Sequence, residues 1–200
     1  MPTTLKNTGC NELNVKHINF DSELNALDNL EKACMFLDSV STNPQDWKWV
    51  TTSLHSAMYG YAINVAKGTD DKSVVNATKR GDRLIPFHEA LKICRMPIGP
   101  RAALSISFGE QESLKFLQNE FRNRFEHFTP GHWSIEISGF PNHVLNQLNV
   151  VRRLALEINF YTHLSIADMQ KTERVFDKCE DLLTNLALNY DTDHLYGVNV

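Results

Sequence analysis

The residue types best suited to chemistry lie in one short run of the sequence, Arg122-Asn123-Arg124-Phe125-Glu126-His127. An arginine guanidinium stays charged and can bind two phosphate oxygens at once. A histidine whose pKa lies near neutrality can move protons to and from the attacking and leaving oxygens. Arginine and histidine together therefore supply what cleavage of a phosphodiester without a metal ion requires, and we expect Asn123 to hold the imidazole in one orientation.

A helix is predicted to carry this run, and helical geometry decides which of its side chains share a face. Asn123 and His127 are four residues apart, so they lie on one face about one turn from each other. Arg122 lies about 140° around the helix from His127. Arg122 also precedes Glu126 by four residues, a spacing that permits an ion pair. Because charged residues in a last helical turn commonly stabilise the helix end, a purely structural role is the competing interpretation.

Apolar residues at helical spacing predict this helix and those that pack around it. Ser107 and Glu110 form a predicted capping box at its start, and Thr129-Pro130-Gly131 is predicted to end it. The other predicted helices span residues 23–40, 44–67, 84–95, 142–164 and 166–188. The predicted fold class is therefore all-α, a bundle of five or six helices.

Three segments lack helical spacing. Residues 69–82 are polar and predict an exposed loop. Apolar and polar residues alternate from His132 to Ser138, which predicts a short extended or strand-like insertion near residues 132–141. Residues 1–20 show no sustained period and predict a loosely ordered leader. Residues 21–200 are then expected to form a single helical domain.

Composition is that of a globular protein, with 42% hydrophobic and 22% charged residues. The apolar stretches fall far short of the roughly 20 residues that span a bilayer. The polar start of the chain does not resemble a signal peptide. Four scattered cysteines, Cys10, Cys34, Cys94 and Cys179, lack the spacing of a metal knuckle. We therefore expect reduced thiols, largely buried, in a cytoplasmic protein with no membrane partner.

Charge is unevenly distributed along a chain whose net charge is −4. Residues 79–153 hold 11 Lys and Arg against 7 Asp and Glu. Residues 1–78 hold 6 against 9, and residues 154–200 hold 3 against 8. The run at 122–127 thus lies in a basic middle segment, where a local positive surface can meet a phosphate. Clustering by chance explains the same distribution equally well.

Most other catalytic signatures are missing from the sequence. There is no Gly-rich phosphate loop and no Gly-x-Ser-x-Gly turn. His88-Glu89 lacks the second histidine of a zinc-protease helix. The spacing of His127, His132 and His143 matches no standard metal site. We therefore expect neither a cofactor nor a metal ion.

Arg122, Asn123 and His127, with four residues between the arginine and the histidine, resemble the signature of the HEPN family (higher eukaryotes and prokaryotes nucleotide-binding domains). The predicted order of helices over residues 21–189 is similar to that family as well. The resemblance implies a metal-independent endoribonuclease of a defence or toxin–antitoxin type. It implies a homodimer in which two copies of the motif form one composite site.

The resemblance also implies a role for each residue. His127 would be the acid/base, Arg122 the anchor for phosphate and transition state, and Asn123 the polar residue that orients them. A ribose 2′-hydroxyl would attack and leave a cyclic phosphate. RNA, a second copy of the chain and an antitoxin or regulatory protein are the partners expected. The alternative is a non-catalytic helical module that binds a partner protein or a nucleotide, as some domains of this family do.

Overall fold

The computed structural model describes residues 21–79, 81–99, 101–127 and 130–195, with side chains described as far as residue 190. These residues form six helices, when α4, α5 and the π-helical turn between them are counted as the one continuous helix that they make. The expected all-α bundle of five or six helices is confirmed. The predicted leader, residues 1–20, lies outside the described residues. In the described part of the chain, no helix has the length and apolar content needed to cross a bilayer.

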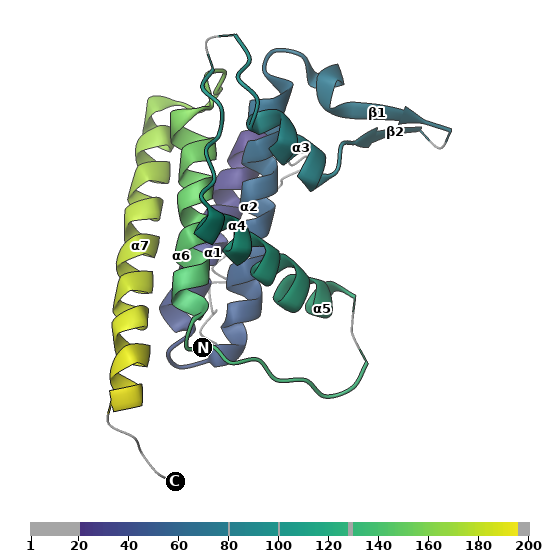
Figure 1. Ribbon diagram of the computed structural model, residues 1–200. Coiled ribbons are helices and arrows are strands. Elements are labelled where there is room, and N and C mark those ends of the chain that lie inside the picture. Colours follow the sequence, from purple (N-terminus) through teal and green to yellow (C-terminus); the bar gives the residue numbers. More distant parts are fainter. Residues whose placement is uncertain (1–20, 80, 100, 128–129, 196–200) are drawn as a thin grey trace, which may run out of the picture.

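Four helices form the bundle: α1 (Ser22–Ser39), α2 (Trp47–Lys67), α6 (Phe140–Arg152) and α7 (Ile166–Leu195). α1 packs against α2 and α7, and α6 packs against the same two helices (Figure 1). Each helix therefore has two neighbours around a shared core. Its largest buried side chains include Leu30, Leu37, Trp47, Leu54, Tyr61, Phe140, Leu154, Phe176 and Leu183.

Local sequence signals begin and end these helices as predicted. Pro44 opens a 3₁₀ turn, Pro44–Asp46, that leads into α2. Gly68 ends α2 with φ +54°, a left-handed conformation that favours glycine. Ser165 caps α7, because its Oγ accepts a hydrogen bond from the backbone N–H of Asp168 at 3.1 Å.

A second layer of helices covers one side of the bundle. α3 (Phe87–Cys94) packs on α2, and α4 (Phe108–Phe116) packs on α6. α4 continues through the π-helical segment Leu117–Arg122 into α5 (Asn123–Glu126) and runs obliquely across the bundle (Figure 1). The predicted capping box at its start is present. The helix ends at Glu126, slightly before the predicted stop.

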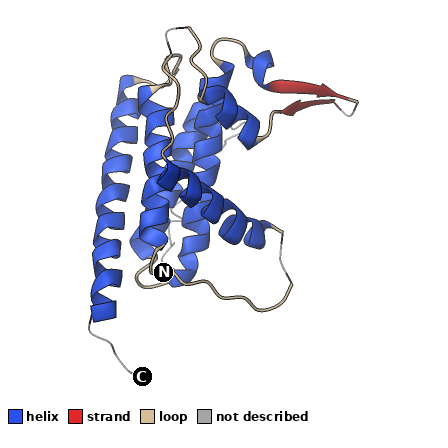
Figure 2. Ribbon diagram, viewed as in Figure 1, coloured by secondary structure: helices blue, strands red, loops and turns tan. Residues whose placement is uncertain are grey.

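The predicted loop at residues 69–82 is wrong. This part of the chain forms a 3₁₀ turn, Asp71–Val74, and an antiparallel hairpin of β1 (Val75–Thr78) and β2 (Gly81–Leu84). The hairpin projects from the helices (Figure 2), and nearly all of its residues are exposed. A half-buried strand alternates apolar and polar residues, but a strand exposed on both faces does not. The sequence therefore lacked the signal by which a strand is recognised.

The insertion after α5 is extended and, within the described residues, has no strand partner. Residues 132–137 belong to no helix or sheet, and α6 begins soon after, at Phe140. Trp133, Ile135 and Ile137 pack against the core while Ser134 and Glu136 are exposed. The predicted alternation of burial is confirmed, and its backbone takes the extended form rather than a paired strand.

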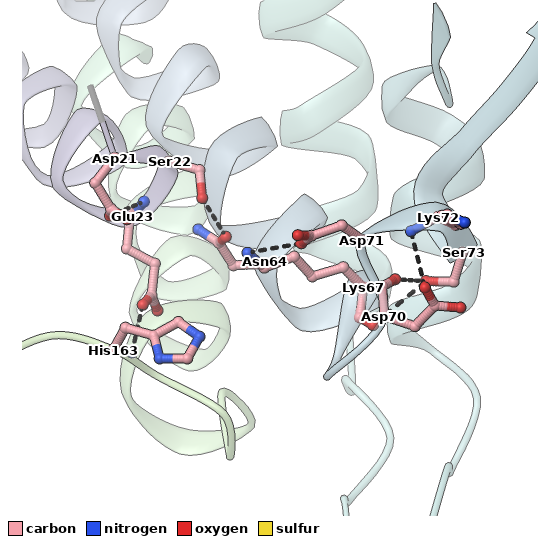
Figure 3. A network of polar contacts seen from close by, with 10 residues as sticks. All are labelled: Asp21, Ser22, Glu23, Asn64, Lys67, Asp70, Asp71, Lys72, Ser73 and His163. Carbon is pink, nitrogen blue, oxygen red and sulfur yellow. Dashed lines mark hydrogen bonds and ion pairs between the residues drawn. The ribbon is translucent and has the colours of Figure 1, made fainter. Parts of the chain in front are cut away.

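A buried carboxylate ties one end of the bundle together. Glu23, in the first turn of α1, is 1% exposed. It accepts hydrogen bonds of 2.6 Å from Asn159 Nδ2 and from the backbone N–H of His163, both in the connection between α6 and α7. Beside it, Ser22 Oγ donates to Asn64 Oδ1 of α2 at 2.8 Å (Figure 3). These hydrogen bonds thus join α1 to α2 and to the connection that leads into α7.

The three cysteines in the described residues, Cys34, Cys94 and Cys179, are buried and free, as predicted. Cys10 lies outside the described residues. Burial raises the pKa of the Cys94 thiol to about 12, so this thiol stays protonated and behaves as a small apolar group.

Candidate functional site

The end of the long oblique helix positions all three candidate residues. Arg122 is the last residue of the π-helical segment, Asn123 begins α5, and His127 is the residue at which α5 ends. The backbone N–H of His127 donates to the carbonyl of Asn123 at 3.0 Å, which keeps these two residues one helical turn apart. A second π-helical segment, Arg153–Glu157, ends α6. Although π turns are frequent at functional sites, this geometry alone does not distinguish the motif.

Arg122 is largely enclosed, and two neighbours hold its guanidinium. Nη2 lies 2.6 Å from Glu126 Oε2, an ion pair that the spacing of four residues permits. Nη1 donates to Asn123 Oδ1 at 3.3 Å. Nε is buried and has no hydrogen-bond partner among the described residues. The guanidinium is therefore oriented, and one of its donors has no acceptor within this part of the chain.

His127 has the opposite environment, because it is exposed at the end of the helix. Trp133 does not cover it: that ring packs on Phe125 with 5.0 Å between ring centroids. None of the contacts among the described residues joins the Arg122 side chain to His127. The structure thus brings Arg122 and Asn123 together and leaves the third residue of the motif to the solvent.

His55 of α2 is a neighbour of Arg122 that the sequence analysis missed. It is 7% exposed, and its ring packs edge-on against Phe87 at 4.7 Å between centroids. Burial, and then the positive charge of Arg122, lower the pKa of His55 to about 4. This imidazole is therefore neutral at physiological pH. Thr51 and Met58, which are four and three residues from His55, are both buried. This spacing places His55 on the buried face of the helix and was the signal in the sequence that could have identified it.

A pocket of about 500 Å³ lies beside the helix end, under the extended insertion. Its aromatic wall consists of Trp47, Phe121, Phe125 and Trp133. Arg124 lies over the Trp133 ring, 5.4 Å from its centroid. The insertion therefore shapes a pocket next to the motif and does not cover the motif.

The basic character of residues 79–153 is not concentrated at the motif. Arg122 and Arg124 are each paired with a glutamate of the same helix, Glu126 and Glu120. Arg153 pairs with Glu110 of the capping box at 2.6 Å. Burial alone would raise the pKa of Glu110, but hydrogen bonds from Arg153 and Ser107 outweigh it and hold the pKa below its usual value.

His127, His132 and His143, the three histidines considered for a metal site, have different neighbours. His143 Nδ1 lies 3.0 Å from Ser113 Oγ, and its ring stacks on Phe116 at 4.5 Å. His132 lines the aromatic pocket, and His127 lies at the helix end. Within the described residues, no group of three or more His, Cys, Asp or Glu side chains is arranged to hold a metal ion.

Comparison of the sequence and structure with protein-family models, curated proteins and solved structures gives no match. The resemblance to the HEPN signature therefore stays a prediction, carried by Arg122, Asn123 and His127.

Proposed function

We propose that this protein is a HEPN-like, metal-independent endoribonuclease of the cytoplasm that acts as a homodimer. The observation that carries the proposal is the contrast within one motif. An oriented, largely enclosed guanidinium lies one helical turn from an exposed imidazole that has no side-chain partner in the described part of the chain. An oriented cation for phosphate and a free proton carrier are the two groups that the chemistry needs.

In this proposal each residue acts through its own chemistry. The RNA 2′-hydroxyl attacks the adjacent phosphorus, and the 5′-oxygen of the next nucleotide leaves. The 2′-hydroxyl loses a proton and the leaving 5′-oxygen gains one; His127 makes one of these transfers and water makes the other. Arg122 stabilises the negative charge that grows on the non-bridging oxygens. Asn123 keeps the guanidinium in place through its Oδ1 contact.

A second copy of the chain is part of the proposal because Arg122 and His127 of one chain do not meet. Two motifs that face each other across a two-fold axis bring the histidine of one copy to the arginine of the other. An antitoxin or regulatory protein would then act by covering the exposed helix end.

The direct experiment is cleavage of mixed RNA by the purified protein, with and without EDTA. We expect wild type to cleave in both conditions and to leave cyclic phosphate ends. His127→Ala should lower kcat by about a hundredfold or more, the usual contribution of general acid–base catalysis. Arg122→Lys should also lower cleavage, because a lysine keeps the charge but not the planar fork.

His163→Ala is the matched control, since His163 is an exposed histidine at the connection between α6 and α7. Its cleavage rate should equal that of wild type. Absence of cleavage in wild type and His127→Ala alike would refute the enzymatic function.

The Arg122–Glu126 ion pair is also what a structural helix end would contain, and it favours the second candidate, a non-catalytic module that binds a partner protein or a nucleotide. Thermal unfolding separates the two. If Arg122→Lys and His127→Ala melt below wild type and wild type cuts no RNA, the motif stabilises the helix end and the module is the function that remains.

A further inference from the structure

A groove lies along the outer layer of helices, between α3 and α4, and is distinct from the motif. It encloses about 460 Å³, within the range of small-molecule sites. Its floor is apolar and consists of Phe87, Leu91, Met96, Ile106 and Leu114. These side chains come from α3, α4 and the segment between them.

The rim of the groove is positive. Lys92 and Arg95, at the end of α3, and Lys115 of α4 line it, and no Asp or Glu is among the lining residues. The remaining polar groups of the lining are neutral amides and a histidine: Gln111, Gln118 and His88. An apolar floor under a positive rim is complementary to a molecule with an apolar body and an anionic head.

Two of these cations have no anion of their own. Lys92 and Arg95 have neither an ion pair nor a side-chain hydrogen bond among the described residues. Lys115 is shared with Glu112, with Nζ 2.8 Å from Oε1. Of the other cations in residues 79–153 that the structure describes, Lys115, Arg122, Arg124, Arg152 and Arg153 form ion pairs, and Arg101 is buried against backbone carbonyls. The exposed cations of this segment that lack an anion in the described part of the chain are therefore those of the groove and of the hairpin. The protein has a net charge of −4, so two cations without an anion at the rim of one groove favour an anionic ligand there.

The dimensions favour a small molecule over a helical peptide. α3 has eight residues and is therefore about 12 Å long at 1.5 Å per residue. Such a wall spans about two turns of a docked helix, too few for several anchoring side chains. The volume, in contrast, suits a ligand of drug or short-lipid size.

We propose that the groove between α3 and α4 binds a small anionic amphiphile, a carboxylate or phosphate attached to an aliphatic or aromatic body. The body lies on Phe87, Leu91 and Leu114. The head group lies at the rim, where Lys92 and Arg95 bind it. Neither His127 nor Arg122 takes part, so this site does not depend on the proposed nuclease activity.

The test is isothermal titration of the full-length protein with three probes of similar chain length whose head groups are anionic, neutral and cationic: decanoate, decanol and decyltrimethylammonium. We expect decanoate to bind about tenfold more tightly than decanol, a difference of about 1.4 kcal/mol from two exposed charge contacts. The cation should bind least. Added salt should weaken decanoate binding and leave decanol binding unchanged.

Charge reversal locates the site. Lys92→Glu with Arg95→Glu should abolish the preference for decanoate while decanol binding persists. The matched control is Lys79→Glu with Arg83→Glu, which reverses two exposed cations on the hairpin, outside the groove lining. Its decanoate affinity should stay within about twofold of wild type. Circular dichroism melts confirm that each double variant is folded.

Three outcomes overturn the proposal: no binding of decanoate to wild type, equal binding of decanoate and decanol, or equal loss of decanoate affinity in both double variants. A single-stranded RNA oligonucleotide is tested in parallel. If it binds wild type, if only the Lys92/Arg95 double variant loses this binding, and if decanoate does not bind, the groove is a nucleic-acid site instead.

Discussion

Two side chains separated by five positions in one helix end have opposite environments. Arg122 is held by Glu126 and Asn123, whereas His127 is exposed. A long, flexible side chain loses conformational entropy when it is held in one orientation. In Arg122 the ion pair with Glu126 already holds the side chain, so phosphate binding does not have to order it. An incoming phosphate must compete with Glu126 for the guanidinium. Binding of RNA at this position should therefore depend on how readily that carboxylate is displaced.

His55 makes stability depend on pH in a way that can be measured. Its pKa is about 4 in the folded protein, below the usual 6.5. Between these values the unfolded chain binds more protons than the folded chain, so stability falls as pH decreases from about 6.5 to about 4. Between pH 7.5 and pH 5.0 this residue should lower the free energy of unfolding by about 2 kcal/mol.

Urea unfolding of wild type and His55→Gln at these two pH values isolates the effect, because the variant keeps the carboxylates and loses the buried imidazole. The variant should lose about 2 kcal/mol less than wild type on acidification. Equal losses in the two proteins would show that His55 is not the source.

At the scale of elements, the connection between α6 and α7 is held by one side chain of α1. Glu23→Ala removes the acceptor of two buried hydrogen bonds and leaves their donors without partners. We expect a loss of about 3 kcal/mol in the free energy of unfolding, since buried donors left unpaired bear the cost of desolvation. Urea denaturation at pH 7 measures it.

Glu31→Ala is the matched control on the same helix. Glu31 forms an ion pair with Lys171 of α7 at 2.8 Å, nearer the surface. Surface pairs contribute about 1 kcal/mol or less, so this variant should lose far less stability than Glu23→Ala. Similar losses in both would mean that the buried bonds do not secure the connection.

The elements differ in how far the sequence predicts them. Ser107, Glu110, Pro44 and Gly68 act on their own backbone neighbourhood, so the helix limits that they set were predictable. The β1–β2 hairpin was not predictable, because its side chains are exposed and leave no alternating pattern.

At the scale of the whole molecule, the separation of Arg122 from His127 predicts complementation between chains. Arg122→Ala and His127→Ala should each be inactive alone. Mixed dimers pair an intact arginine of one chain with an intact histidine of the other. After random exchange of subunits, cleavage should recover up to about a quarter of the wild-type rate.

The measurement is RNA cleavage after the two variants are unfolded and refolded together, with sedimentation to confirm the dimer. Refolding of two differently tagged His127→Ala preparations is the control and should restore nothing. A monomer in sedimentation, or no recovery in the mixed sample, would contradict a site built by two chains.

The sequence by itself determined what acts over a few residues: the helices, their caps, and the ion pair between Arg122 and Glu126. Within a helix, positions three or four apart are neighbours whatever surrounds them, so such contacts follow from spacing. It also supplied the candidate residues, because chemistry belongs to side-chain type.

Only the tertiary structure decided what depends on segments far apart in the chain. It placed His55 beside Arg122, gave Glu23 a partner 140 residues away, and left Lys92 and Arg95 without an anion among the described residues. Such neighbours result from how the helices pack, and packing is a collective balance of burial over the whole core. The candidate residues of the motif could therefore be chosen from the sequence, but the exposure of His127 and the enclosure of Arg122 could not be predicted from it.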